Sequence, residues 1–238
     1  MCGRFSISID AGTYNRFRIS KGHAPPMVRY NVAPSQEVPV VRQDADRDNE
    51  ILMMRWGLVP SWSRDRKSIH PIINARAETL LERPAFRSLV KDRRCLVPAT
   101  GFFEWRVFNG KRPYYVHMRD NSPFAFAGMY DTWKDDAGGP TLTFTIITTE
   151  PNELVKTLHS RMPAILRRED EGRWLDGGVL SSEELSMILS PYPPEYMKAY
   201  EVGRLVNNPG NEGMSVIAPV SEDDSRKMQT RLALDGEK

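Results

Sequence analysis

The sequence is poor in cysteine and histidine. Its 238 residues include two cysteines, Cys2 and Cys95, and four histidines. Two cysteines cannot build a disulfide framework or a four-cysteine zinc site, and no two histidines have a metal-binding spacing such as H-x-x-x-H. We therefore expect no metal site, and the low cysteine content fits a reducing cytoplasm.

Long apolar runs are also absent. The longest stretch without a charged residue, residues 137–149, has 13 residues, whereas a membrane-spanning helix needs about 20 apolar ones. No apolar segment of the kind found in secretory signals follows residues 1–5. These absences predict a cytoplasmic protein without a membrane partner, associated with the nucleoid if its source is prokaryotic.

Charge is present in quantity but is unevenly distributed. The net charge is +2, yet residues 1–120 carry 21 Lys and Arg against 12 Asp and Glu, whereas residues 121–238 carry 12 against 19. A basic half of this kind can follow a phosphate backbone, although the same side chains can simply be solvated faces of helices and loops. The basic clusters are Arg64, Arg66 and Lys67, and Arg83, Arg87, Lys91, Arg93 and Arg94.

Short runs rich in Val, Ile, Phe, Tyr and Thr dominate the middle of the chain and predict strands. They lie at residues 37–43, 51–56, 94–98, 101–108, 113–118, 124–130 and 142–149. Asn109 with Gly110, and the segment 135–140, have the composition of hairpin turns. Helices are predicted at residues 10–17, 84–90, 151–158, 168–175 and 181–189, the last with a capping box made by Ser181 and Glu184.

The order of these elements predicts the fold class. Strands and helices do not alternate regularly, which favours an α+β fold with a mainly antiparallel sheet. No repeat or linker divides the chain, so we expect one domain over residues 1–221. Residues 222–238 carry 9 charges in 17 residues and no aromatic side chain, which predicts a disordered tail or a frayed helix.

Cys2 is the most unusual placement in the sequence. Once Met1 is removed, Cys2 presents an amine and a thiol on adjacent carbons, with reference pKa values of about 8 and about 8.5. An aldehyde can condense with the amine, and the thiol can then close onto the imine carbon to give a thiazolidine. The alternative is a small buried residue at the start of a strand, which is the role expected for Cys95 in its own apolar run.

Other polar residues have two interpretations each. Glu104 lies between aromatic residues in a predicted strand, where alternation makes a surface-facing carboxylate the default; half burial would instead raise its pKa and make it a proton donor near pH 7. His159 can be structural or can titrate near neutrality. Asn74 can cap a turn, or it can orient a sugar hydroxyl or a terminal amine. Arg4 and Arg76 can bind phosphate or pair with carboxylates.

Six motifs occur in a fixed order along the chain. They are MCGRF at 1–5, YNVAP at 30–34, WGLVPSW at 56–62, NARAET at 74–79, GFFEW at 101–105 and HSRMP at 159–163. In this order they closely resemble the SRAP family, the SOS response-associated peptidases or abasic-site processing proteins, over about residues 2–220.

The resemblance implies a single α+β domain with an open, barrel-like antiparallel sheet, peripheral helices and a basic groove for single-stranded DNA. Members of the family crosslink covalently to abasic sites in such DNA. By match of motif, the catalytic residues would be Cys2, Asn74, Glu104 and His159. The DNA-binding residues would be Arg4, Trp62, Arg76 and Arg161, although Ser63 follows Trp62 where some relatives carry a second aromatic.

The implied reaction is lyase-type crosslinking at abasic sites, and an autoproteolytic peptidase activity would expose Cys2. It needs no metal and no organic cofactor, and we expect a monomer. Two other functions stay open. One is an autoprocessing cysteine peptidase that acts on other peptide bonds, since Cys2 with His159 superficially resembles a thiol protease set. The other is a non-catalytic nucleic-acid binder that relies on the basic half alone.

Overall fold

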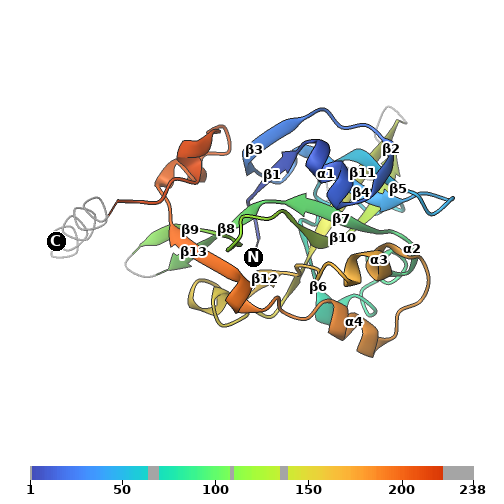
Figure 1. Ribbon diagram of the computed structural model, residues 1–238. Helices are drawn as coiled ribbons and strands as arrows, with labels where there is room; N and C mark the ends of the chain where they lie inside the picture. Colours follow the sequence, from blue (N-terminus) through green and yellow to red (C-terminus); the bar gives the residue numbers. More distant parts are fainter. Residues whose placement is uncertain (1, 64–69, 108–109, 135–138, 222–238) are drawn as a thin grey trace.

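The computed structural model describes residues 2–63, 70–107, 110–134 and 139–221 (Figure 1). Several features predicted above therefore lie outside the described residues. These are the tail at 222–238, the cluster Arg64, Arg66 and Lys67, the first residue of the 109–110 turn, and most of the 135–140 loop.

Five strands form a closed barrel. Their order is β11-β10-β7-β4-β5, and parallel pairing of β5 with β11 closes the ring by placing Arg55 opposite Thr143 and Trp56 opposite Phe144. The other neighbouring strands in the ring are antiparallel. The strands are β4 (Glu37–Gln43), β5 (Asn49–Trp56), β7 (Arg94–Ala99), β10 (Phe124–Lys134) and β11 (Pro140–Thr149).

A second, antiparallel sheet has the order β13-β9-β8-β1-β3, and β9 and β13 extend to the left of the barrel in Figure 1. Three short strands complete the described sheets: β2 pairs with β5, and β6 and β12 both pair with β11. The remaining strands are β1 (Phe5–Ile9), β2 (Ile19–Gly22), β3 (Met27–Val32), β6 (Asn74–Arg76), β8 (Gly101–Val107), β9 (Lys111–Met118), β12 (Met162–Pro163) and β13 (Met197–Glu201).

The helices are short and lie outside the sheets. They are α1 (Ala11–Arg16), α2 (Leu89–Asp92), α3 (Asp170–Leu175) and α4 (Ser182–Ile188), with 3₁₀ turns η1 (Ala77–Thr79), η2 (Val155–Thr157), η3 (Pro194–Tyr196), η4 (Arg204–Asn207) and η5 (Met214–Val216). Within the described ranges, no helix has the length and apolar character that a membrane crossing requires.

Aromatic side chains fill the main core. Phe5 contacts Trp56 and Phe126 edge-on at 5.2 and 5.8 Å between ring centroids, and Trp56 stacks on Phe144 at 6.4 Å. The Trp56 indole donates to the carbonyl of Ile73 at 2.9 Å, so its N–H is satisfied although the side chain is wholly buried. Barrel strands with both faces buried have nearly continuous apolar runs, which is why the sequence identified them.

All seven predicted strands are confirmed, as are the helices at 10–17, 168–175 and 181–189 and the Ser181–Glu184 capping box. Two helix predictions are wrong. Residues 84–88 form turns, and α2 begins only at Leu89. The segment 151–158 contains only η2, because the Asn152 side chain accepts from the Val155 N–H at 2.9 Å and donates to the Tyr192 carbonyl at 2.6 Å, which favours a turn.

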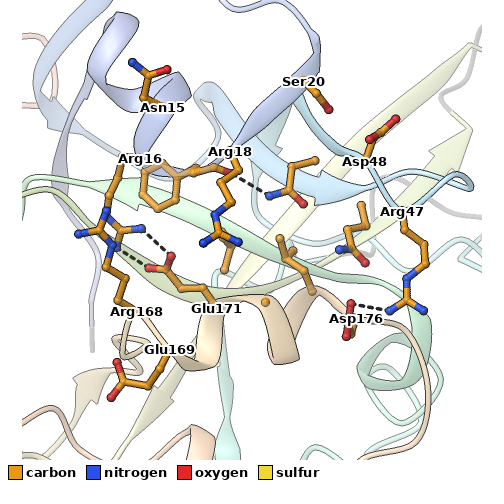
Figure 2. Close-up of a pocket in the computed structure, with 16 residues that line it drawn as sticks. Asn15, Arg16, Arg18, Ser20, Arg47, Asp48, Arg168, Glu169, Glu171 and Asp176 are labelled. Atoms are coloured by element: carbon orange, nitrogen blue, oxygen red, sulfur yellow. Dashed lines mark hydrogen bonds and ion pairs between the residues drawn. The ribbon is translucent and has the colours of Figure 1, made fainter.

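The ion pair between Arg16 and Glu171 ties α1 to α3 across a cavity of about 560 Å³. Figure 2 shows the Arg16 guanidinium reaching the Glu171 carboxylate, with two hydrogen bonds of 2.6 and 2.7 Å. At the other side of the cavity, Arg47 pairs with Asp176 at 2.5 Å. None of the residues predicted for the functional site lines this cavity.

Removing one partner of the buried pair should destabilise the fold. The Arg16 and Glu171 side chains are 14% and 9% exposed, so Glu171→Gln leaves a mostly buried guanidinium without its counter-ion. We expect a loss of about 3 kcal/mol in the free energy of unfolding, measured by urea denaturation. The exposed neighbour Glu169 provides the control, and Glu169→Gln should change stability by less than about 0.5 kcal/mol. Equal effects of the two substitutions would contradict a stabilising role for the pair.

Candidate functional site

Strand pairing places the start of the chain beside β8. Phe5 pairs with Phe102, and the Phe103 N–H donates to the Arg4 carbonyl at 3.0 Å. The chain before Phe5 brings Cys2 near enough to Glu104 for the charge of that carboxyl group to act on the thiol. Cys2 is wholly buried. The aminothiol residue therefore lies inside the protein, next to a carboxyl group.

Asn74 holds this segment from a different strand. It begins β6, where it pairs with Ile146 of β11, and its side-chain N–H donates to the Cys2 carbonyl at 2.8 Å. The amide oxygen of Asn74 is buried and accepts no hydrogen bond from the described residues. An acceptor in this state can take a donor from a terminal amine or a sugar hydroxyl.

Glu104 is 1% exposed, so the surface-facing default is wrong. The reason is that both faces of the second sheet are covered: Phe103 and Tyr115 pack in a small core on one side, and Phe102 packs in the main core on the other. Alternation puts Glu104 on the Phe102 side. Burial raises the pKa of Glu104 to about 7, which makes it a proton donor and acceptor near neutrality.

The pKa of the Cys2 thiol is also raised, but the thiol does not titrate near neutral pH as Glu104 does. Burial, and then the nearby charge of Glu104, raise the pKa of the Cys2 thiol above its usual range. At neutral pH the sulfur therefore keeps its proton. The same is true of Cys95, whose pKa is raised by burial in the core, and whose predicted role as a small buried residue is confirmed.

His159 and Arg161 lie in the turn that leads into β12. The backbone N–H of Arg161 donates to His159 Nδ1 at 3.0 Å, so the neutral imidazole carries its proton on Nε2. Burial lowers the pKa of His159, which favours this neutral form. Because β12 and β6 flank β11, this turn lies on the same strand end as Asn74.

The predicted DNA-binding residues differ in their surroundings. The Arg4 guanidinium donates to the Asn31 side chain at 2.8 Å and to the Val206 carbonyl at 2.6 Å. Arg76 is exposed and makes no ion pair within the described part of the chain, and Trp62 is 67% exposed. Arg76 and Trp62 are thus available to a ligand, whereas Arg4 already ties β3 to η4.

Arg94 does not belong to a phosphate-binding surface. It is 3% exposed, and its guanidinium donates to the backbone carbonyls of Val90, Trp174 and Gly178. Neither interpretation of the 83–94 cluster, a phosphate-binding surface or a solvated face, holds for this residue, because charge counting does not detect burial. No group of three His, Cys, Asp or Glu side chains in the described ranges is arranged to hold a metal ion.

Comparison with known proteins identifies the family. The family model for the SOS response associated peptidase (SRAP) matches residues 1–209. The chain belongs to the SRAP family. It is 41% identical over 225 residues to the abasic site processing protein YoaM of Bacillus subtilis, covering 91% of this chain and 97% of YoaM. It is 32% identical over 264 residues to the abasic site processing protein HMCES of Gallus gallus, covering 92% and 78% of the two chains.

The fold is also similar to solved structures. A crystal structure of a protein from Bacteroides thetaiotaomicron superposes with a TM-score of 0.80 at 32% identity, covering 92% of this chain and all of that one. The fold class implied by the SRAP resemblance is thus confirmed, except that the barrel is closed rather than open, because β5 pairs in parallel with β11.

Two residues of the SRAP motifs had no predicted role. Asn31 is wholly buried and donates to the carbonyls of Asn208 and Asn211, at 2.9 Å each, which holds the C-terminal segment against β3. Glu78 pairs with Arg161, at 2.6 Å between the nearest atoms. The motifs contain both residues, but only the fold reveals partners so distant in sequence.

The raised pKa of Glu104 predicts a pH-dependent cost to stability. Between the unfolded pKa, about 4.5, and the folded pKa, about 7, the folded state binds the proton more tightly, so stability falls as pH rises through this window. From pH 5.5 to 8 this one group should cost the wild type about 2 kcal/mol. Glu104→Gln should lose that dependence, measured by urea denaturation at both pH values. The exposed Glu37 is the control, and identical pH dependence of Glu104→Gln and Glu37→Gln would refute the assignment.

Proposed function

We propose that this protein is an abasic site processing protein that crosslinks covalently to abasic sites in single-stranded DNA through Cys2. The observation that carries the proposal is the burial of Cys2 beside Glu104, a carboxyl group with a pKa of about 7. Family membership supports it, since the relatives YoaM and HMCES are named abasic site processing proteins. A monomer suffices, and the reaction needs no metal or cofactor.

The reaction begins once Met1 is removed. The amine of Cys2 attacks the open-chain aldehyde of the abasic deoxyribose, and loss of water leaves an imine. The thiol then adds across the C=N bond: sulfur bonds to carbon, and the thiol proton ends on nitrogen. The product is a thiazolidine that joins Cys2 to the DNA, and no oxidant or reductant takes part.

The neighbouring groups supply the proton transfers. Neutral Glu104 can protonate the departing hydroxyl as water, and its carboxylate can then accept a proton from the thiol, because a pKa near 7 makes both forms available. The free amide oxygen of Asn74 can accept from the Cys2 amine or from the sugar. His159, with its proton on Nε2, can donate to the sugar oxygen or assist reversal.

The DNA is held by Arg76 through a phosphate and by Trp62 through base stacking, and Arg4 and Arg161 contribute only the guanidinium N–H groups that their partners within the protein leave free. Arg76 supports this most directly, because it is exposed and has no counter-ion within the described ranges. Exposure of the Trp62 indole fits a stacking platform.

Autoproteolytic removal of Met1 is the peptidase activity that fits this site. General cleavage of other proteins fits it less well. Cysteine proteases work through a thiolate, whereas burial and Glu104 keep the Cys2 thiol protonated. A purely electrostatic DNA binder would have no use for the buried carboxyl group beside Cys2.

One assay separates these functions. Wild-type protein incubated with single-stranded DNA that carries one abasic site should give a shifted band that survives denaturation. Cys2→Ser should form only an imine, which borohydride traps, because its hydroxyl does not close a stable ring. A variant with an uncleavable extra residue before Cys2 should form neither product. Normal crosslinking by this blocked variant would mean that Cys2 acts as an ordinary thiol and that the thiazolidine mechanism is wrong.

Affinity for DNA should be electrostatic. Each neutralised phosphate releases counter-ions, so affinity for single-stranded DNA without an abasic site should fall steeply with salt. Arg76→Ala should lower the slope of log affinity against log salt by roughly one phosphate contact, about 0.7. Fluorescence anisotropy measures both effects, and Arg119→Ala provides a matched exposed control. An unchanged slope for Arg76→Ala would place Arg76 outside the DNA path.

A further inference from the structure

Glu78 follows directly after the strand that carries Asn74 and Arg76. It lies in η1, and its two carboxylate oxygens accept from Nη1 and Nη2 of Arg161 at 2.6 and 2.9 Å. Hydrogen bonding to Arg161 lowers the pKa of Glu78, so the carboxylate is ionised throughout the neutral range. This two-pronged geometry fixes the plane of the guanidinium as well as its position.

The remaining contacts of Arg161 extend this link to the barrel. Nη2 also donates to the Thr148 carbonyl of β11 at 2.6 Å, and the Arg161 side chain is 15% exposed. The end of the guanidinium that normally grips a phosphate with two parallel hydrogen bonds is therefore occupied by Glu78. Nε is buried and has no acceptor among the described residues.

The backbone of Arg161 connects this anchor to His159. Its N–H donates to His159 Nδ1 at 3.0 Å, which sets the tautomer of the neutral imidazole. That contact exists only while residue 161 keeps its place relative to the ring. The side chain of Arg161, held by Glu78 and Thr148, supplies the anchor for the turn.

We propose that Glu78 is a positioning residue: by holding Arg161, it keeps His159 in the tautomer with the proton on Nε2. The proposal rests on the proposed function for its catalytic consequence, but its structural part does not. Glu78 is 47% exposed, and an ion pair with so exposed a partner contributes little to stability. A positioning residue should affect the tautomer of His159 and the crosslinking rate, whereas an ordinary surface ion pair should affect neither.

The tautomer can be measured in the free protein. Imidazole ¹⁵N shifts of the wild type should show His159 Nδ1 as an unprotonated acceptor and Nε2 as protonated. Glu78→Gln should shift both signals toward a mixture of tautomers, and Glu78→Asp, which keeps the charge, should restore them in part. Glu82→Gln, a nearby exposed carboxylate, is the control and should match the wild type. His159 signals that are unchanged in Glu78→Gln would overturn the proposal.

The catalytic consequence is measured with abasic single-stranded DNA at saturating concentration. Glu78→Gln should slow crosslink formation about tenfold, since His159 no longer holds its proton toward the reacting group, and saturation keeps any change in DNA affinity out of the measured rate. Glu78→Asp should recover part of the rate. A wild-type rate in Glu78→Gln would refute the catalytic role. Absence of any wild-type crosslink would refute the proposed function instead, and the ¹⁵N shifts would still decide whether Glu78 positions His159.

Discussion

The pairing of β1 with β8 is the constraint on which the site depends. Because Phe5 lies opposite Phe102, the pairing directs the residues before β1 past Glu104 and into the interior, where Cys2 is buried. The Asn74 side chain then fixes the Cys2 carbonyl. A chain terminus is ordinarily mobile, and here strand register and one amide place it beside a buried carboxyl group.

Three segments far apart in sequence meet at one end of β11. They are β6, β12 and the start of the chain, whose Cys2 carbonyl accepts from Asn74. Strand β11 pairs with β6 on one side and β12 on the other, which brings Asn74 and the turn of His159 to a common region. The rigid barrel therefore supplies the platform, and short segments carry two of the candidate catalytic side chains, Asn74 and His159. This division is common in enzymes, where a stable scaffold positions functional loops.

Much of the fold follows from local sequence, and the site follows only in part. Barrel strands such as β10 have continuous apolar runs that identify them, whereas β6 and β12 are three and two residues long and exist only because β11 pairs with them. The ordered motifs point to Cys2 and His159. Alternation misplaced Glu104, because no local pattern reveals that both faces of its sheet are covered. The Glu78–Arg161 pair was missed for a similar reason, since its partners are distant in sequence.

The burial of Cys2 has a consequence for timing during biosynthesis. The strands β6 and β8, which place Asn74 and Glu104 beside Cys2, are synthesised long after the first residues leave the ribosome. Until then the start of the chain is accessible to an aminopeptidase. Afterwards Cys2 is enclosed, with its carbonyl bound by Asn74. An enzyme that acts on Cys2 itself therefore has better access to it in the nascent chain than in the folded protein.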